Sequence, residues 1–258
     1  MRMQSSNMAL SDSVLSKWGM NDPTGAISRP AATMTIGGTA MKTLSLLGIA
    51  GGTAGVVWTM AASLPLMAVT FGGVIIGLVL GLVMAFKPNL ARYLAFPYAF
   101  AQGGFLGGIS LLYAGGVGAQ GGVGAGIVIW AVLITFGVFG TMLLAYTSRV
   151  IRATPGLVKF IVGGLGAIMI VLIVSLVLRM FMDIPTLGEL GPLGIGIAAA
   201  VCVFAALSFI VDFKIIEDLS AQGAPKHMEW YGAFAILASL IFLYIWVLRL
   251  LSLLRGND

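Results

Sequence analysis

Seven long apolar runs constrain this chain more than any other feature of its sequence. Each is close to the ~20 residues that an α-helix needs to cross ~30 Å of hydrocarbon. Transmembrane strands are excluded, because they alternate over about 10 residues whereas these runs are unbroken and about twice as long. The pattern predicts an all-α polytopic membrane protein with a bundle of seven transmembrane helices. The runs span about residues 42–60, 66–86, 93–113, 123–146, 157–181, 192–212 and 230–253.

The charge of the chain fits a membrane rather than a soluble surface. Only 9% of its residues are Asp, Glu, Lys or Arg, against roughly 25% in soluble domains. Although the formal net charge is +5, the cations lie at the ends of the apolar runs, so the expected partner is the lipid bilayer and not a nucleic acid. The one cysteine, Cys202, lies within an apolar run, which excludes a disulfide framework and a cysteine metal site.

The chain divides into a polar arm, residues 1–40, and a transmembrane domain, residues 41–258. We expect the arm to be a flexible cytoplasmic segment; a weakly amphipathic patch at residues 10–18 leaves a short helix on the membrane surface as the alternative. No short apolar core with a cleavage site precedes the first run, which we therefore expect to act as the insertion signal. The third run is the least regular, because Pro97 and four glycines leave open a kinked or split helix.

The positively charged residues predict which side of the membrane each loop occupies. With the N-terminus inside, eleven Lys and Arg residues fall on inner segments and three, Arg179, Arg249 and Arg255, on outer segments. An excess of Lys and Arg is typical of cytoplasmic loops. We therefore expect a cytoplasmic N-terminus and a cytoplasmic connection between the sixth and seventh runs.

Four of the nine carboxylate side chains gather around that connection, within residues 208–231. Asp212 ends the sixth run, Glu217 and Asp218 follow it, and Glu229 begins the seventh run. An acid inside a membrane segment is costly unless it has a partner, and it is a functional hypothesis by default. We interpret the four acids as a candidate ion-gating or pH-sensing cluster in which Asp212 and Glu229 converge on one polar site.

Each of these acids also has an ordinary structural explanation. Asp212 would pair with Lys214 or with another inner cation. Glu217 and Asp218 would form surface pairs with Lys214 on the same helix. Glu229 would simply favour the N-terminus of the seventh helix, where the helix dipole stabilises an acid. Both sets of explanations stay open on the sequence alone.

The remaining polar residues point to helix contacts rather than to catalysis. Gln102, in the middle of the third run, either makes a hydrogen bond between helices or lines a pathway. Glycines spaced by four, such as Gly103 and Gly107, permit close helix packing. His227, the single histidine, lies in a loop, and the chain has no Walker A loop, His-Glu-x-x-His or paired-cysteine motif. We therefore expect no catalytic residue, no bound metal and no cofactor.

Short motifs in a fixed order resemble one known family. Over about residues 30–255, their order and spacing are similar to those of the bacterial branch of the Bax inhibitor family. The motifs are M-T-I-G-G-T-A-M-K-T at 34–43, F-G-V-F-G-T-M-L-L-A-Y at 136–146, I-R-A-T-P-G at 151–156, G-P-L-G-I-G at 191–196, V-D-F-K-I-I-E at 211–217, A-P-K-H-M-E-W-Y at 224–231 and L-R-L-L at 248–251.

The resemblance implies a seven-helix bundle whose last helix is central and largely enclosed by the other six. It also implies a pH-sensitive calcium leak of the bacterial inner membrane, gated by two carboxylates on the sixth and seventh helices, with calcium as the permeant ion. Asp212 matches the acid of the sixth helix. The matching position on the seventh helix is either Trp246, in which case the second acid is missing, or Glu229. Gln102 stands where relatives often carry a glutamate.

Two functions therefore stay open on the sequence. The leading hypothesis is a Bax-inhibitor-like membrane protein whose acid cluster controls a cation leak or a pH-dependent conformation. The rival is a non-conducting regulatory membrane protein that binds other membrane proteins, such as a quality-control protease, with residues 1–40 as its docking segment. A secondary transporter is disfavoured because the chain has no clear inverted repeat.

Overall fold

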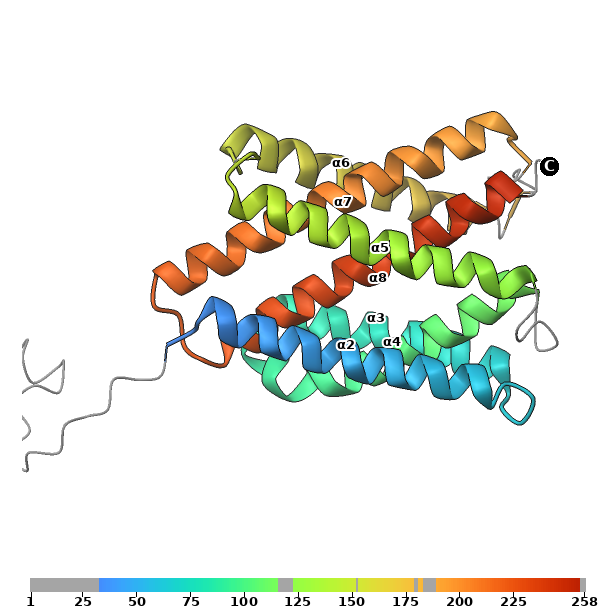
Figure 1. The fold of residues 1–258 in the computed structure, drawn as a ribbon, viewed down its shortest axis with the longest axis horizontal. Coiled ribbons are helices and arrows are strands. Elements are labelled where there is room, and N and C mark those ends of the chain that lie inside the picture. Colours follow the sequence, from blue (N-terminus) through green and yellow to red (C-terminus); the bar gives the residue numbers. More distant parts are fainter. Residues whose placement is uncertain (1–32, 116–122, 152, 179–180, 183–188, 256–258) are drawn as a thin grey trace, which may run out of the picture.

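A computed structural model describes residues 33–115, 123–151, 153–178, 181–182 and 189–255 of the chain (Figure 1). The greater part of the polar arm, residues 1–32, and the predicted outer cation Arg179 lie outside the described residues. The described helices are α2 (Ile36–Thr59), α3 (Leu66–Phe86), a 3-10 turn η2 (Pro88–Leu90), α4 (Ala91–Ala114), α5 (Val123–Thr147), α6 (Pro155–Leu178), α7 (Pro192–Ala221) and α8 (Met228–Arg255).

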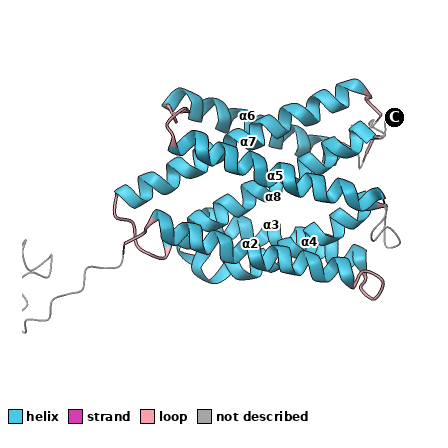
Figure 2. Cartoon of the chain, in the orientation of Figure 1, coloured by secondary structure: helices cyan, strands magenta, loops and turns pink. Residues whose placement is uncertain are grey.

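The all-α prediction is confirmed, and every predicted run coincides with one long helix (Figure 2). Six of these helices are long and apolar enough to cross a membrane by length and composition; α4 falls below that level of hydropathy. Helix α4 packs between α2 and α3. Because it turns small and polar residues toward those helices and not toward lipid, its mean hydropathy is lower. Pro97 lies inside α4 without splitting it, so the least regular run is a single helix.

Two helices extend beyond their predicted runs by more than one turn. Helix α2 begins at Ile36, before the charged Lys42 that marked the predicted start. Helix α7 continues through Asp212 to Ala221. In both cases the sequence prediction stopped at a charge, whereas in the structure that charge has a partner on a neighbouring helix.

Helix α8 is the central element, as the family resemblance implied. It packs chiefly against α2, α4, α5 and α7, and Figure 1 shows it crossing the middle of the bundle between the α2–α4 group and the α6–α7 pair. The enclosure is less complete than expected, since α3 packs mainly on α4 and α6 mainly on α7. Large apolar side chains on the outer faces, such as Phe71, Trp130 and Ile170, are exposed, as lipid-facing residues of a membrane bundle are.

The spaced glycines of α4 are contact points between helices, as the packing interpretation predicted. A Cβ built on Gly103 would lie 2.5 Å from the backbone oxygen of Ala50 on α2, and one on Gly107 would lie 2.8 Å from that of Ala54. Only glycine permits so close a backbone approach, which in lipid supplies much of the attraction between helices. These contacts therefore fix the position of α2 along α4.

Candidate functional site

The segment before α2 is fastened to the connection between α7 and α8. Met34 N–H donates a hydrogen bond to Ala224 O over 2.7 Å, Ser220 Oγ donates to Met34 O over 3.3 Å, and Thr33 forms an isolated bridge with Pro225. We call this group, residues 33–42 together with 220–230, the clasp. It lies at the end of the bundle where the α3–α4 connection also meets the α7–α8 connection, through a 3.0 Å hydrogen bond between Asn89 and His227.

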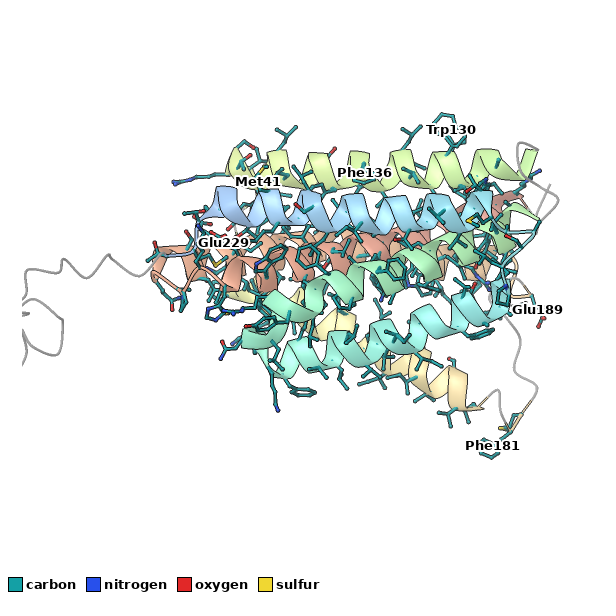
Figure 3. All side chains as sticks on the ribbon, turned by 90° about the horizontal axis from the view of Figure 1, so that it is seen from below. Met41, Trp130, Phe136, Phe181, Glu189 and Glu229 are labelled. Atoms are coloured by element: carbon teal, nitrogen blue, oxygen red, sulfur yellow. The ribbon has the colours of Figure 1, made fainter. Side chains whose placement is uncertain are left out.

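Glu229 is the centre of the clasp, with only 1% of its side chain exposed. Its Oε2 accepts a 2.6 Å hydrogen bond from Lys42 Nζ, and its Oε1 accepts from both Thr35 N–H and Thr35 Oγ1 at 3.0 Å. Lys42 also lies 4.9 Å from the ring centroid of Trp230. Figure 3 shows Glu229 beside the start of α2, while Trp130 points away on the outside of the bundle.

Two helix N-termini meet at this one carboxylate. Thr35 is the N-cap of α2, and its side chain accepts a hydrogen bond from Gly38 N–H. Glu229 itself lies in the first turn of α8. Since a helix N-terminus carries partial positive charge, both dipoles and Lys42 stabilise the ionised carboxylate. A Cβ at Gly38 would collide with that carboxylate, so glycine is needed there for space.

Asp212 has a different partner on a different part of α8. Its Oδ2 accepts a 2.6 Å hydrogen bond from Ser239 Oγ, and its side chain is partly buried. The hydroxyl of a serine bonds well to a carboxylate, so the contact joins the central helix to α7 within the membrane-spanning part of the bundle.

The expectation that Asp212 and Glu229 converge on one polar site is therefore wrong. Ser239 follows Glu229 by ten residues on α8, which at 1.5 Å per residue is about 15 Å along the helix. Each acid is satisfied by its own partners. The residue opposite Asp212 is neither Glu229 nor Trp246 but Ser239, which sequence reasoning missed.

The other two acids are held near the end of α7. Glu217 accepts a hydrogen bond from the hydroxyl of Tyr146 on α5. Asp218 forms an ion pair with Lys214 one turn earlier, at 3.0 Å, as the surface-pair interpretation predicted. Lys214 does not pair with Asp212, so that alternative for Asp212 is not realised. Three of the four acids thus join α7 and α8 to a neighbouring helix, whereas Asp218 pairs within α7, and the four do not form one cluster.

Trp246 and Gln102 both lie in helix contacts. Trp246 is buried against Ala198 and Val201 of α7, with its ring 6.3 Å from that of Phe242. Gln102 is buried on α4, where its amide nitrogen lies beside Gly77 of α3, and its Oε1 has no hydrogen-bond partner. Neither residue reaches Asp212. Within the described part of the chain, no group of three or more His, Cys, Asp or Glu side chains could hold a metal ion.

Comparison with known families fits this architecture. A family model described as Bax inhibitor 1 like matches residues 4–256 of the chain. The chain belongs to the Bax inhibitor 1 like family. Together with six helices apolar enough to span a membrane, the match makes it an integral membrane protein. No match was found among curated proteins or among solved structures.

The residues of the clasp fall in two of the motifs that resemble those of the Bax inhibitor family. Thr35, Gly38 and Lys42 belong to the motif at residues 34–43, and Glu229 belongs to the motif at residues 224–231. Both motifs supported the family resemblance, but nothing in either shows that they touch. For Ser239 a signal did exist, because it is an isolated small hydroxyl residue in the apolar run 232–243.

Proposed function

We propose that this Bax inhibitor 1 like protein is a pH-sensitive cation leak of the bacterial inner membrane, with its N-terminus in the cytoplasm. The observation that carries the proposal is the 2.6 Å hydrogen bond from Ser239 Oγ to Asp212 Oδ2. It places an ionisable group at the contact between the central helix and α7. Adding a proton to Asp212 removes a charge from that contact, and so changes how strongly the two helices hold each other.

The surroundings of Asp212 make it the group to test. Along α7 the nearest charged residues are Lys214, which is paired with Asp218, and Glu217, which is bonded to Tyr146 of α5. From α8 the facing polar group is the Ser239 hydroxyl. With its charged neighbours engaged elsewhere, Asp212 is free to respond to protons through the α7–α8 contact.

Asp212→Asn is expected to flatten the pH dependence of cation flux. The amide keeps the shape of the carboxyl and still accepts a hydrogen bond from Ser239, but it cannot gain or lose a proton. Flux would be measured with the full chain in liposomes loaded with a calcium indicator, at a series of pH values. The matched control is Asp218→Asn, which changes an exposed acid on the same helix and should leave the pH dependence intact. If the unaltered protein passes neither calcium nor a monovalent cation at any pH, the proposed leak is excluded.

Ser239→Asp is expected to steepen the pH dependence of the same flux. It would put a second carboxylate against Asp212, and two carboxylates in contact repel when both are ionised. Protons would then be taken up more strongly at the contact as the pH falls. Ser239→Asn, of similar size and without charge, is the control and should behave as the unaltered chain does. Equal profiles for the two variants would contradict a gate at this contact.

A second candidate is a non-conducting regulator that binds other membrane proteins. It is favoured by two contacts among the described residues: the partner of Asp212 is Ser239 and not an acid, and Glu229 is paired with Lys42. Both contacts leave few anionic oxygens for a divalent ion. Deleting residues 1–32, which spares Thr35 and the clasp, should then abolish co-purification of partners while the bundle still folds. In neither candidate do we assign a catalytic residue or a cofactor.

A further inference from the structure

A long groove lies between α2 and α5. It consists of two hollows that share Leu47 and that are both open to the outside of the bundle. The hollow farther from the clasp has a volume of about 320 Å³, and the one nearer the clasp about 760 Å³. Helix α8 contributes to the lining of both, through Ile236 in one and Tyr244 in the other. We call the two hollows together the α2–α5 groove.

Helix α2 turns one continuous face to the groove. Its lining residues recur at helical spacing from Ile36 through Thr43, Leu47 and Ala54 to Trp58, a length of about 33 Å at 1.5 Å per residue. Helix α5 lines the opposite side from Val128 to Thr147. The groove therefore extends along a distance close to the ~30 Å thickness of the hydrocarbon core.

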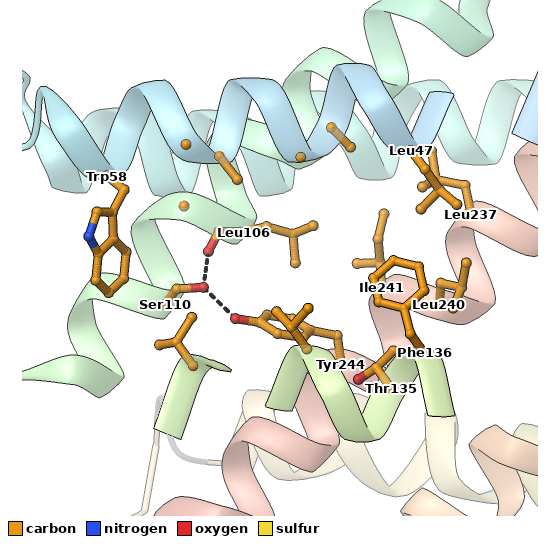
Figure 4. Close-up of a pocket in the computed structure, with 17 residues that line it drawn as sticks. Leu47, Trp58, Leu106, Ser110, Thr135, Phe136, Leu237, Leu240, Ile241 and Tyr244 are labelled. Atoms are coloured by element: carbon orange, nitrogen blue, oxygen red, sulfur yellow. Dashed lines mark hydrogen bonds between the residues drawn. The ribbon is translucent and has the colours of Figure 1, made fainter. Parts of the chain in front are cut away.

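The half of the groove farther from the clasp is apolar and has unused space. Figure 4 shows Trp58 and Leu47 at its two ends and the hydroxyls of Ser110 and Tyr244 bonded to each other, so these two polar groups already have partners. Gly51 and Gly55 of α2 line the hollow, and a Cβ on either would meet nothing within 4 Å. Unlike Gly103 and Gly107, they are not needed for helix contact; they keep the groove wide.

The groove also exposes apolar side chains toward the bilayer. Leu44 is 63% exposed and Phe136 is 48% exposed, and both line it. A hollow with such walls does not replace the hydration shell of a cation, whereas a hydrocarbon chain fills it with favourable contacts on every side.

Two cations, Arg149 and Lys214, line the end of the groove near the clasp. Lys214 is paired with Asp218, whereas the Arg149 side chain has no hydrogen-bond or ion-pair partner among the described residues. The acid at this end of the groove, Glu217, accepts a hydrogen bond from the Tyr146 hydroxyl. Arg149 also has a φ of 58°, a left-handed conformation that is uncommon for a side-chain-bearing residue and that recurs at ligand sites.

We propose that the α2–α5 groove binds one anionic phospholipid drawn from the surrounding bilayer. Its acyl chain lies along the apolar floor formed by α8, and its phosphate meets Arg149 at the end near the clasp, where Lys214 also lines the groove. A basic pocket between transmembrane helices is a recognised way to hold an anionic headgroup. The inference is independent of the proposed function, because it needs no ion flux.

The test is native mass spectrometry of the full chain, purified in mild detergent and offered phosphatidylglycerol or phosphatidylcholine. The unaltered protein should retain one phosphatidylglycerol in preference to phosphatidylcholine. Gly55→Leu places a side chain in the groove and should remove the retained lipid. Gly52→Leu is the matched control, because Gly52 lies on the same helix with equally open space around its Cβ but does not line the groove.

Arg149→Gly tests recognition of the lipid headgroup separately from binding of the acyl chain. Glycine readily adopts the left-handed conformation at this position, so the fold should be kept, and helicity by circular dichroism should be unchanged. The preference for phosphatidylglycerol should fall about fivefold, the effect of one cation near the headgroups, while chain binding persists. Equal retention of both lipids by the unaltered protein, or equal effects of Gly52→Leu and Gly55→Leu, would overturn the proposal and leave only non-specific annular lipid.

Discussion

Lys42→Met is expected to destabilise the bundle by about 3 kcal/mol, the cost of leaving a buried charge without its partner. The side chain of Glu229 is 1% exposed and that of Lys42 is 17% exposed. Methionine keeps most of the apolar stem of lysine but offers nothing to Glu229 Oε2. The carboxylate would then keep only the Thr35 donors. The measurement is unfolding in mixed micelles with increasing denaturing detergent, followed by tryptophan fluorescence.

Glu229→Gln supplies the matched comparison and should cost less. Its amide oxygen still accepts from Thr35, and Lys42, being partly exposed, can turn its ammonium toward water. In the double variant, Lys42→Met should cost much less than it does alone, giving a coupling of about 2 kcal/mol, in the range seen for contacting residues. A coupling near zero would mean that the clasp is not held by this ion pair.

Gly103→Ala is expected to destabilise the bundle by about 1–3 kcal/mol, as overpacking of a close contact does. The added Cβ would lie 2.5 Å from Ala50 O and 2.7 Å from Thr53 Cβ. Because the nearest of these atoms belongs to the backbone of α2, the strain cannot be relieved by turning a side chain. The α2 helix itself would have to move away from α4.

Gly104→Ala is the control on the next residue of the same helix. There the nearest atom to an added Cβ is a side-chain methyl carbon, Val69 Cγ1, at 3.4 Å, which is an ordinary van der Waals contact. Alanine also favours a helix over glycine by up to ~1 kcal/mol, so the variant should unfold at an unchanged or slightly higher denaturant concentration. If both alanines have the same effect, the α2–α4 contact is looser than the distances indicate.

The clasp changes how the acid-rich connection is understood. Four carboxylates within residues 208–231 suggested one cluster on the sequence, yet Glu217 contacts α5, Glu229 contacts α2 and Asp212 contacts the middle of α8. Three of the four acids thus hold α7 and α8 to other helices. Asp212 alone remains a candidate for sensing protons inside the bundle.

The sequence by itself determined the number of long helices in the described part of the chain, their membrane character and the family. These features follow from composition and run length, because a segment of about 20 apolar residues in lipid must satisfy its backbone internally as a helix. The excess of Lys and Arg residues on alternate connections between the runs also follows directly from the sequence. So does the surface pair of Lys214 and Asp218, since residues four apart on one helix are neighbours.

Only the tertiary structure decided which side chains meet. Lys42 and Glu229 are separated by 187 residues, and Asp212 and Ser239 by 27. Helices that are apolar on every side carry no stripe to show which face turns inward, so their rotation and depth relative to one another cannot be read from periodicity. Those two quantities are set by close contacts such as Ala50 against Gly103, and they put a serine, not a second acid, opposite Asp212.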